Sequence, residues 1–249
     1  MNKRIVQTTS TKATKLKYEH PTGTLVTLVD RYIDKASGNT TWFVSPKVDG
    51  LYLEKAKELI NEANKKRGIV FASRGPVNPK DHTQGCAFTD EENLLDFFLL
   101  TTEVVILLYS AVEFLTNYSI EKAVDLTYKK YKYLSIFHIG GIRLELKKKV
   151  TLSQQEILFL RTEEKLKYVL PQHYSCESPS QKVFWESFIK LKHFRDDVIH
   201  ATRYKTYGAS RAQNSVYAEL LAVDLNKLLA DVEQLLYYLD QNIKQQAEA

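Results

Sequence analysis

The chain has 249 residues, 44% of them apolar, and a formal net charge of +5. This composition excludes an intrinsically disordered chain, and only nine glycines and six prolines argue against a turn-rich β-sandwich, so we expect a mainly α-helical fold. Residues 1–88 contain 15 Lys and Arg against 8 Asp and Glu, whereas residues 89–249 contain 20 against 22. A polyanionic partner is therefore expected at the N-terminal end.

Residues 1–88 are predicted to form a small basic α+β module that recruits RNA or senses a trigger. In chain order we expect a polar arm at residues 1–20, strands at 22–34 and 38–45, a helix at 46–68, a strand at 69–73 and a loop at 74–86. Ser45-Pro46 is typical of a helix start and Gly68 of a helix end. The two strands are expected on either side of Ser37-Gly38-Asn39.

A strongly apolar helix should follow the module. The residues Thr89 to Glu92 fit a capping box, which predicts a helix from Asp90 to Tyr118. This segment contains Asp96, Glu103 and Glu113, whereas a membrane span needs about 20 nearly uncharged residues. We therefore expect a buried helix and no membrane association.

The remaining sequence also predicts mostly helices, with residues 120–150 as an insertion. In chain order we expect a helical stretch from Ser119 to Leu134 with a break at Gly140-Gly141, a strand or irregular segment at 142–150, a helix from the Ser153–Glu156 capping box to Leu170, a helix containing Phe184, Phe188, Leu191 and Val198, a loop near Gly208 and a last helix from Asn214. In the last helix apolar residues recur at alternating steps of four and three, which indicates either packing within the protomer or a dimer seam. These residues are Leu221, Leu225, Leu228, Val232, Leu235 and Leu239.

The segment HFRDDVIHATRY contains an Arg-x4-His pair, Arg195 and His200. An arginine fork binds phosphate oxygens, and a histidine exchanges protons near neutral pH. Together they would supply the acid, the base and the cation that RNA cleavage without a metal requires. Five helical steps separate the two side chains by about 140°, so either the helix bends or two chains complete the site.

The surrounding segments resemble those of the HEPN superfamily of helical nucleases. RDDVIH, preceded by FWESFIKLKHF, resembles the family's Arg-polar-x3-His signature, and YSAVEFLTNY and TEEKLKYVL resemble its two earlier core helices. The resemblance covers roughly residues 90–246. It implies an up-down helical bundle that dimerises with its motifs facing across a two-fold axis, and a metal-independent ribonuclease, often a toxin or an effector of antiviral defence.

The resemblance also implies roles for individual residues. Arg195 would hold the scissile phosphate, His200 would be the acid and base, and Asp196 would orient the pair. Glu113 would face them from the first helix, and Asn117 lies four residues later on the same face. Some members of the family have lost catalysis and act as interaction modules.

The segment YKKYKY interleaves lysines with tyrosines, and this pattern suits RNA. Tyrosine rings stack on unpaired bases and lysines neutralise phosphates, so Lys129, Lys130 and Tyr131 are candidate substrate contacts. The alternative is an amphipathic helix with a solvated lysine face.

Two cysteines and an N-terminus without an apolar leader indicate a cytoplasmic protein. The pairs His82/Cys86 and His173/Cys176 would make a zinc site only if the fold joined them, and nothing in the sequence does so; we therefore expect no metal and no cofactor.

The sequence thus predicts a metal-independent endoribonuclease that is a homodimer with RNA as its substrate, together with an unidentified regulatory partner. One alternative is a non-catalytic dimerisation or interaction module, in which Arg195 pairs with Asp196, Asp197 or Glu113. The other is a nucleic-acid binder that uses the basic N-terminal module.

Overall fold

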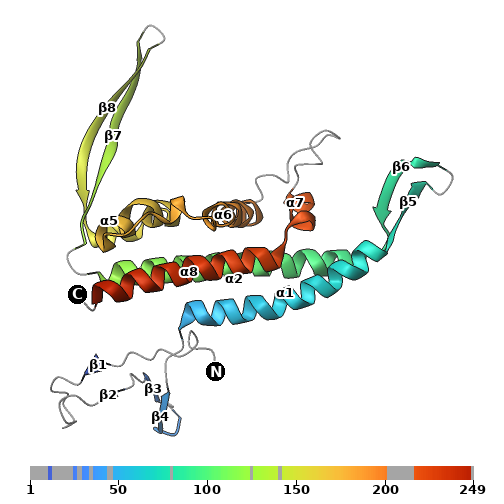
Figure 1. Cartoon of the computed structure of the whole chain (residues 1–249), viewed down its shortest axis with the longest axis horizontal. Coiled ribbons are helices and arrows are strands. Elements are labelled where there is room, and N and C mark those ends of the chain that lie inside the picture. Colours follow the sequence, from blue (N-terminus) through green and yellow to red (C-terminus); the bar gives the residue numbers. More distant parts are fainter. Residues whose placement is uncertain are drawn as a thin grey trace. The chain divides into compact units, whose positions relative to one another are not determined.

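The computed structural model describes residues 11–12, 25–26, 30–33, 36–43, 47–78, 81–123, 126–139, 142–200 and 216–247. Within these ranges the chain is mainly helical, with small antiparallel sheets of two strands each (Figure 1). It divides into two compact units, Met1–Ala111 and Val112–Ala249, so the boundary falls inside helix α2 (Glu91–Lys122). The helix start predicted at Ser45-Pro46, the loop near Gly208 and the arm at residues 1–20, apart from Thr11 and Lys12, lie outside the described residues.

The strands of the first unit pair antiparallel with their sequence neighbours. Their bounds are Thr11–Lys12 (β1), Leu25–Val26 (β2), Asp30–Ile33 (β3), Thr40–Phe43 (β4), Arg74–Asn78 (β5) and Asp81–Phe88 (β6). Strands β3 and β4 confirm a pair of strands on either side of Ser37-Gly38-Asn39, but within the predicted strand at 22–34 Leu25–Val26 (β2) pairs with β1 and only Asp30–Ile33 (β3) pairs with β4. Gly38 has a φ of +72°, a left-handed conformation that glycine adopts readily.

Helix α1 (Val48–Ala72) is longer than predicted. The expected end at Gly68 and the expected strand at 69–73 are wrong, because both lie in the last turns of this helix. Buried residues recur at helical spacing along α1 as far as Val70, which is fully buried. Glycine inside a helix costs only about 1 kcal/mol relative to alanine, so the burial of Val70 outweighs the Gly68 signal.

The expected loop at residues 74–86 is also wrong, because most of it belongs to the β5–β6 hairpin. The register shifts between Pro76 and Asn78, as expected where proline cannot donate to the ladder. The hairpin is anchored to the end of α1, where the Arg74 guanidinium lies 4.1 Å from the centre of the Phe71 ring and Phe71 packs against Phe88 at 5.6 Å. The Gly and Pro residues of this segment led to the prediction of a loop where the structure has a short hairpin.

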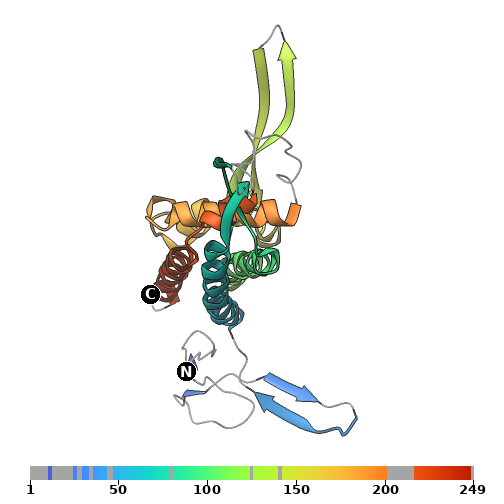
Figure 2. The ribbon, with the colours of Figure 1, turned by 90° about the vertical axis from the view of Figure 1, so that its right-hand side faces the viewer.

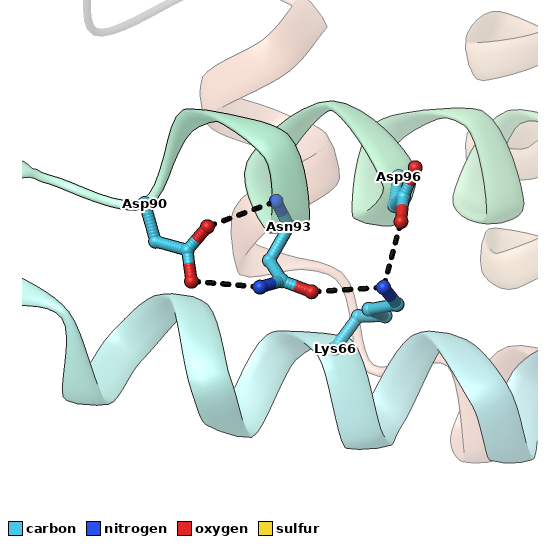
Figure 3. Close-up of polar contacts among 4 residues, drawn as sticks. All are labelled: Lys66, Asp90, Asn93 and Asp96. Atoms are coloured by element: carbon cyan, nitrogen blue, oxygen red, sulfur yellow. Dashed lines mark hydrogen bonds and ion pairs between the residues drawn. The ribbon is translucent and has the colours of Figure 1, made fainter.

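Helix α2 is capped one residue later than predicted. The Asp90 carboxylate, and not the Thr89 hydroxyl, accepts the Asn93 amide at 3.1 Å, while the Thr89 hydroxyl donates to the Ser73 carbonyl. Figure 3 shows how this cap joins α1. Asn93 donates its side-chain amide to Asp90 and accepts from Lys66 at 2.8 Å, and Lys66 also pairs with Asp96 at 2.6 Å. This network fixes α1 against the start of α2 within the first unit.

By length and composition, α2 is the one helix in the described part of the chain that would suffice to cross a membrane. A core helix of a soluble protein passes the same test. Val104, Val105, Leu108 and Val112 of α2 are fully buried, whereas Leu95 and Leu99 near its start are exposed, so the helix predicted to be buried is buried only in part.

The second unit contains a long hairpin and several helical segments in addition to the end of α2. Their bounds are Tyr128–Ile139 (β7), Ile142–Leu152 (β8), Gln154–Leu158 (α3), Thr162–Glu164 (α4), Lys165–Val169 (η1, a π-helical turn), Leu170–Tyr174 (α5), Pro179–Gln181 (η2, a 3₁₀ turn), Trp185–His200 (α6), Val216–Ala222 (α7) and Leu225–Ala247 (α8). Strands β7 and β8 form one long antiparallel ribbon (Figures 1 and 2).

The helical stretch predicted from Ser119 to Leu134 is wrong beyond Lys122. Helix α2 runs on to Lys122, and Gln154 then donates its side-chain amide to the carbonyls of Ile120 and Ala123, which satisfies the end of the helix. From Tyr128 the chain is a strand. The tyrosines at 128, 131 and 133 do not follow a strict period of two, so the segment did not distinguish a strand from an amphipathic helix, and the helix predicted here is wrong.

The single helix predicted from Ser153 to Leu170 is wrong in two respects, because it is interrupted at residues 159–161 between α3 and α4 and because it continues past Pro171 to Tyr174. The predicted Ser153 capping box is confirmed by reciprocal bonds with Glu156. Upstream of Pro171 the backbone widens into the π-helical turn η1, and the Ser178 hydroxyl donates to the Lys167 carbonyl, the i−4 acceptor that proline cannot reach. Proline is thereby accommodated inside a helix.

The predicted last helix is divided into α7 and α8, with a break at Val223 and Asp224. Helix α8 packs on α6, and the Ser187 hydroxyl donates to the Asp231 carboxylate between them. Most of the seam is buried inside this chain, which confirms the prediction of packing within the protomer; its buried members are Leu225, Leu228, Val232, Leu235 and Leu239.

The break before α8 gives a first prediction, because the Asp224 carboxylate accepts the Lys227 amide at 3.0 Å as an N-cap. Asp224→Ala should lower the free energy of unfolding by about 1 kcal/mol, since a helix amide loses its acceptor. Urea denaturation followed by circular dichroism measures this. Asp224→Asn, which keeps an acceptor oxygen, should lie close to the parent; equal losses in both variants would contradict the assignment.

Candidate functional site

Four consecutive residues, Thr162 to Lys165, connect three other elements of the second unit; we call them the TEEK turn. The Glu163 carboxylate pairs with Lys192 of α6 at 2.6 Å. The Glu164 carboxylate pairs with Lys130 of β7 at 2.8 Å. Thr162 and Lys165 both contact α2. Because successive side chains of a helical turn leave in different directions, one turn can hold α2, α6 and β7 at once.

The predicted residues Glu113 and Asn117 lie together at this turn. Glu113 accepts a hydrogen bond from the Thr162 hydroxyl at 3.3 Å, and the Asn117 carbonyl oxygen accepts from the Lys165 ammonium at 2.7 Å. The spacing of four residues places both side chains on one face of α2, as predicted.

Lys165 is 2% exposed and belongs to the hydrophobic core. Its ammonium group also donates to the Leu158 carbonyl at 2.6 Å. Burial lowers the pKa of Lys165 below its usual value, and the negative charge of Glu113 partly offsets this effect. An ammonium group in the core is tolerated only with such acceptors, so Asn117 and Leu158 are required for its burial.

Arg195 and Asp196 lie next to each other on a half-exposed side of α6. The Arg195 Nη1 donates to the Asp196 carboxylate at 3.0 Å. Lys192, one turn earlier on this side, is joined to Glu163 of the TEEK turn. A chain of contacts therefore runs from Glu113 through the TEEK turn to the helix that presents the arginine.

Asp197 belongs to a different side of α6. It is 7% exposed and follows the fully buried Leu191 and Phe194 at helical spacing. The two aspartates after Arg195 therefore differ: Asp196 contacts the guanidinium at the surface, and Asp197 places a carboxyl group in the core.

His200 is the last residue of α6, and its side chain lies outside the described residues. The helix is continuous from Arg195 to His200. On an ideal helix these two positions are about 140° apart.

The candidate RNA contacts Lys129, Lys130 and Tyr131 are residues of strand β7. Lys129 is exposed, whereas Lys130 is half-buried and its ammonium group lies 2.8 and 2.9 Å from the two oxygens of Glu164. The backbone places Tyr131 opposite Lys149 of β8, and the Tyr131 side chain is outside the description.

Sequence reasoning missed Lys165, Glu163 and Lys192 as members of this site. Lys165 lies three residues after Thr162 and four before Val169, and all three are buried. Because Lys165 occupies a position on the buried face of the helix, the spacing alone indicated that its side chain is buried.

Two other features lie apart from the motif residues. A cavity of about 710 Å³ lies along α8 beside Phe184, and Tyr237 and Tyr238 line it.

Within the described ranges, no group of three or more His, Cys, Asp or Glu side chains is placed to hold a metal ion. Burial raises the pKa of the Cys176 thiol, which makes it a weak metal ligand, and the side chains of His82 and Cys86 fall outside the description.

No protein-family model matches the chain, and comparisons with curated proteins and with solved structures return no significant match. The function proposed below therefore depends on the residues of this chain and on their contacts.

The buried ammonium group gives a second prediction. Lys165→Met should lower the free energy of unfolding by about 1–3 kcal/mol, because the buried oxygens of Asn117 and Leu158 lose their donor. Lys227→Met, at an exposed position of α8, should change it by less than about 0.5 kcal/mol.

The lowered pKa of Lys165 fixes the sign of a pH effect. The folded chain releases this proton at a lower pH than the unfolded chain does, so the stability of the parent relative to Lys165→Met should rise as the pH approaches 10.5. Chemical denaturation of both proteins between pH 7 and pH 10 measures the difference. A difference that falls with pH would mean that the ammonium group is better stabilised in the core than in water.

Proposed function

We propose that this chain is a metal-independent endoribonuclease of the HEPN type that acts as a homodimer. The observation that carries the proposal is that Arg195 and His200 lie on one uninterrupted helix, α6. A straight helix directs these two positions about 140° apart. A cleft that holds one phosphate between a guanidinium and an imidazole is therefore best completed by the same helix of a second copy.

In the proposed reaction His200 removes the proton of a ribose 2′-hydroxyl, and that oxygen attacks the adjacent phosphorus. The bond from phosphorus to the 5′ oxygen breaks, and the leaving oxygen takes the proton from the imidazolium that His200 has become. The products are a 2′,3′-cyclic phosphate and a 5′-hydroxyl. Arg195 stabilises the charge on the phosphorane, since a guanidinium keeps its charge at any relevant pH.

The surroundings of Arg195 support this role. Its side chain is partly exposed and therefore open to a ligand from solvent, and Asp196 binds it through Nη1. Asp196 acts as a positioning residue, because it limits the directions in which the fork can point. The burial of Asp197 keeps the second carboxylate away from the surface that would receive the phosphate.

Glu113 is a positioning residue in this proposal. It contacts Thr162, and the next residue, Glu163, holds Lys192 one turn before Arg195 on α6. Loss of Glu113 would therefore act on the placement of α6. Such an enzyme suits a cytoplasmic toxin or antiviral effector, in which residues 1–88 recruit RNA or sense a trigger.

The third prediction tests the reaction. With EDTA present, His200→Ala and Arg195→Ala should each lower the rate of RNA cleavage at least 100-fold, because each removes a group that acts on the transition state. Gel analysis of a labelled RNA measures the rate, and the cyclic phosphate end identifies the mechanism.

His193→Ala is the matched control, because His193 is an exposed histidine two residues before Arg195 on the same helix. It should cleave at the rate of the parent. Activity that survives in both His200→Ala and Arg195→Ala would refute the mechanism.

The ion pair between Arg195 and Asp196 also favours a second candidate, a non-catalytic interaction module. There Arg195 has a structural role only. The fourth prediction is that in this case Arg195→Ala and Asp196→Ala lower the melting temperature to a similar extent, while RNA incubated with the parent stays intact. Differential scanning calorimetry beside the cleavage assay separates the two candidates.

A further inference from the structure

The β7–β8 ribbon holds a concentrated positive charge. Residues 128–152 contain seven Lys and Arg against one Glu, a net charge of +6, while the whole chain has +5. The basic residues are Lys129, Lys130, Lys132, Arg143, Lys147, Lys148 and Lys149. Residues 1–88 have a net charge of +7, but it is spread over a much longer segment, so the ribbon has the higher density of positive charge and is a strong candidate for a polyanion contact outside the residues proposed for cleavage.

The base of the ribbon has an inner and an outer face. Tyr128 and Lys130 of β7 are half-buried, as are their partners Leu152 and Val150 of β8. The residues between them, Lys129, Lys149 and Thr151, are exposed. This alternation is the period of two that a strand imposes.

The inner face is occupied by contacts within the chain. Lys130 pairs with Glu164 of the TEEK turn at 2.8 Å. Burial, followed by the nearby Glu164 and Tyr168, raises the pKa of Tyr128. These two residues therefore attach the ribbon to the helices. Because Lys130 is paired within the chain, Lys129 is the better candidate of the two for contact with RNA.

The outer face continues up the ribbon by register. Tyr131 is opposite Lys149 and Tyr133 is opposite Lys147, and the register shifts only after Tyr133. The outer face up to this bulge thus consists of Lys129, Tyr131, Tyr133, Lys147, Lys149 and Thr151. By register, positions 131 and 133 of β7, both tyrosines, lie opposite positions 149 and 147 of β8, both lysines, and alternate positions are about 6.6 Å apart along each strand.

We propose that this outer face binds single-stranded RNA. A row of lysines neutralises successive phosphates, and a neighbouring row of tyrosines offers rings on which unpaired bases stack. Duplex RNA does not fit the pattern as well, because its bases are already stacked and its major groove is too narrow for side chains to read. The inference rests on the proposed ribonuclease for RNA as the substrate, whereas the binding itself needs neither Arg195 nor His200.

The fifth prediction concerns the lysine row. Binding of a fluorescein-labelled, unstructured 20-nucleotide RNA is followed by anisotropy, with full-length His200→Ala protein so that the RNA stays intact. Adding Lys147→Gln and Lys149→Gln should weaken binding at least tenfold at 0.1 M salt. The slope of log affinity against log salt should become shallower by about 1.4, since each phosphate contact on a single strand contributes about 0.7.

The tyrosine row is tested by Tyr131→Val with Tyr133→Val, substitutions that keep a high strand propensity. Binding of the single strand should weaken at least fivefold with an unchanged salt slope, because stacking involves no ion release. The same protein should bind a duplex of equal length as the parent does.

The matched control removes two exposed lysines elsewhere, Lys65→Gln with Lys227→Gln, and so makes the same change in net charge. It should bind as the parent does. Lys147→Arg with Lys149→Arg should also retain binding, and unchanged melting temperatures show that each variant is folded. Equal losses in the control and ribbon variants, or no binding by the parent, would overturn the proposal.

Different experimental outcomes would refute the ribbon proposal and the nuclease proposal. A parent that binds the single strand through the ribbon but does not cleave it refutes the nuclease and supports the ribbon. A parent that cleaves RNA, with ribbon variants that bind and cleave at its rates, overturns the ribbon proposal and leaves the nuclease.

Discussion

The buried ammonium group of Lys165 imposes the strictest requirement on the second unit. An amine that is 2% exposed must meet acceptors before it can leave water, and here they are the side chain of Asn117 and the Leu158 carbonyl. Each acceptor fixes a different part of the chain, since Asn117 belongs to α2 and Leu158 ends α3. The position of the TEEK turn relative to α2 is therefore set by hydrogen-bond geometry as well as by apolar packing.

The other contacts of the TEEK turn depend on this position. Glu163 and Glu164 lie half-buried on the same turn, and each reaches a lysine of another element. Individually such pairs contribute little, because part of their charge is solvated. Because the TEEK turn is fixed, these ion pairs mainly set the orientations of α6 and β7. In these orientations Arg195 is partly exposed and Lys129 is exposed.

The sequence was most informative where one physical signal acted alone. The capping box at Ser153, the turn at Gly38 and the apolar seam of α8 all follow from local chemistry, and each is confirmed. Prediction failed where two signals competed. Gly68 indicated a helix end while burial of Val70 required another turn, and Pro171 indicated a stop that a π-helical turn and Ser178 overcome. In the candidate site, the four-residue spacing of Glu113 and Asn117 was recognised, whereas Lys165, the residue that joins α2 to the turn, was missed. Lysine is so seldom fully buried that only its place on an apolar stripe marked it.

The register of the ribbon has a further consequence. Lys132 lies directly opposite Lys148, and like charges in such pairs destabilise a hairpin. Added salt screens this repulsion and should tighten the pairing of β7 with β8, yet the same screening weakens attraction to a polyanion. Ionic strength therefore acts on this element in two opposed directions, because screening relaxes the repulsion within this pair and also weakens the attraction of the basic ribbon to any polyanion.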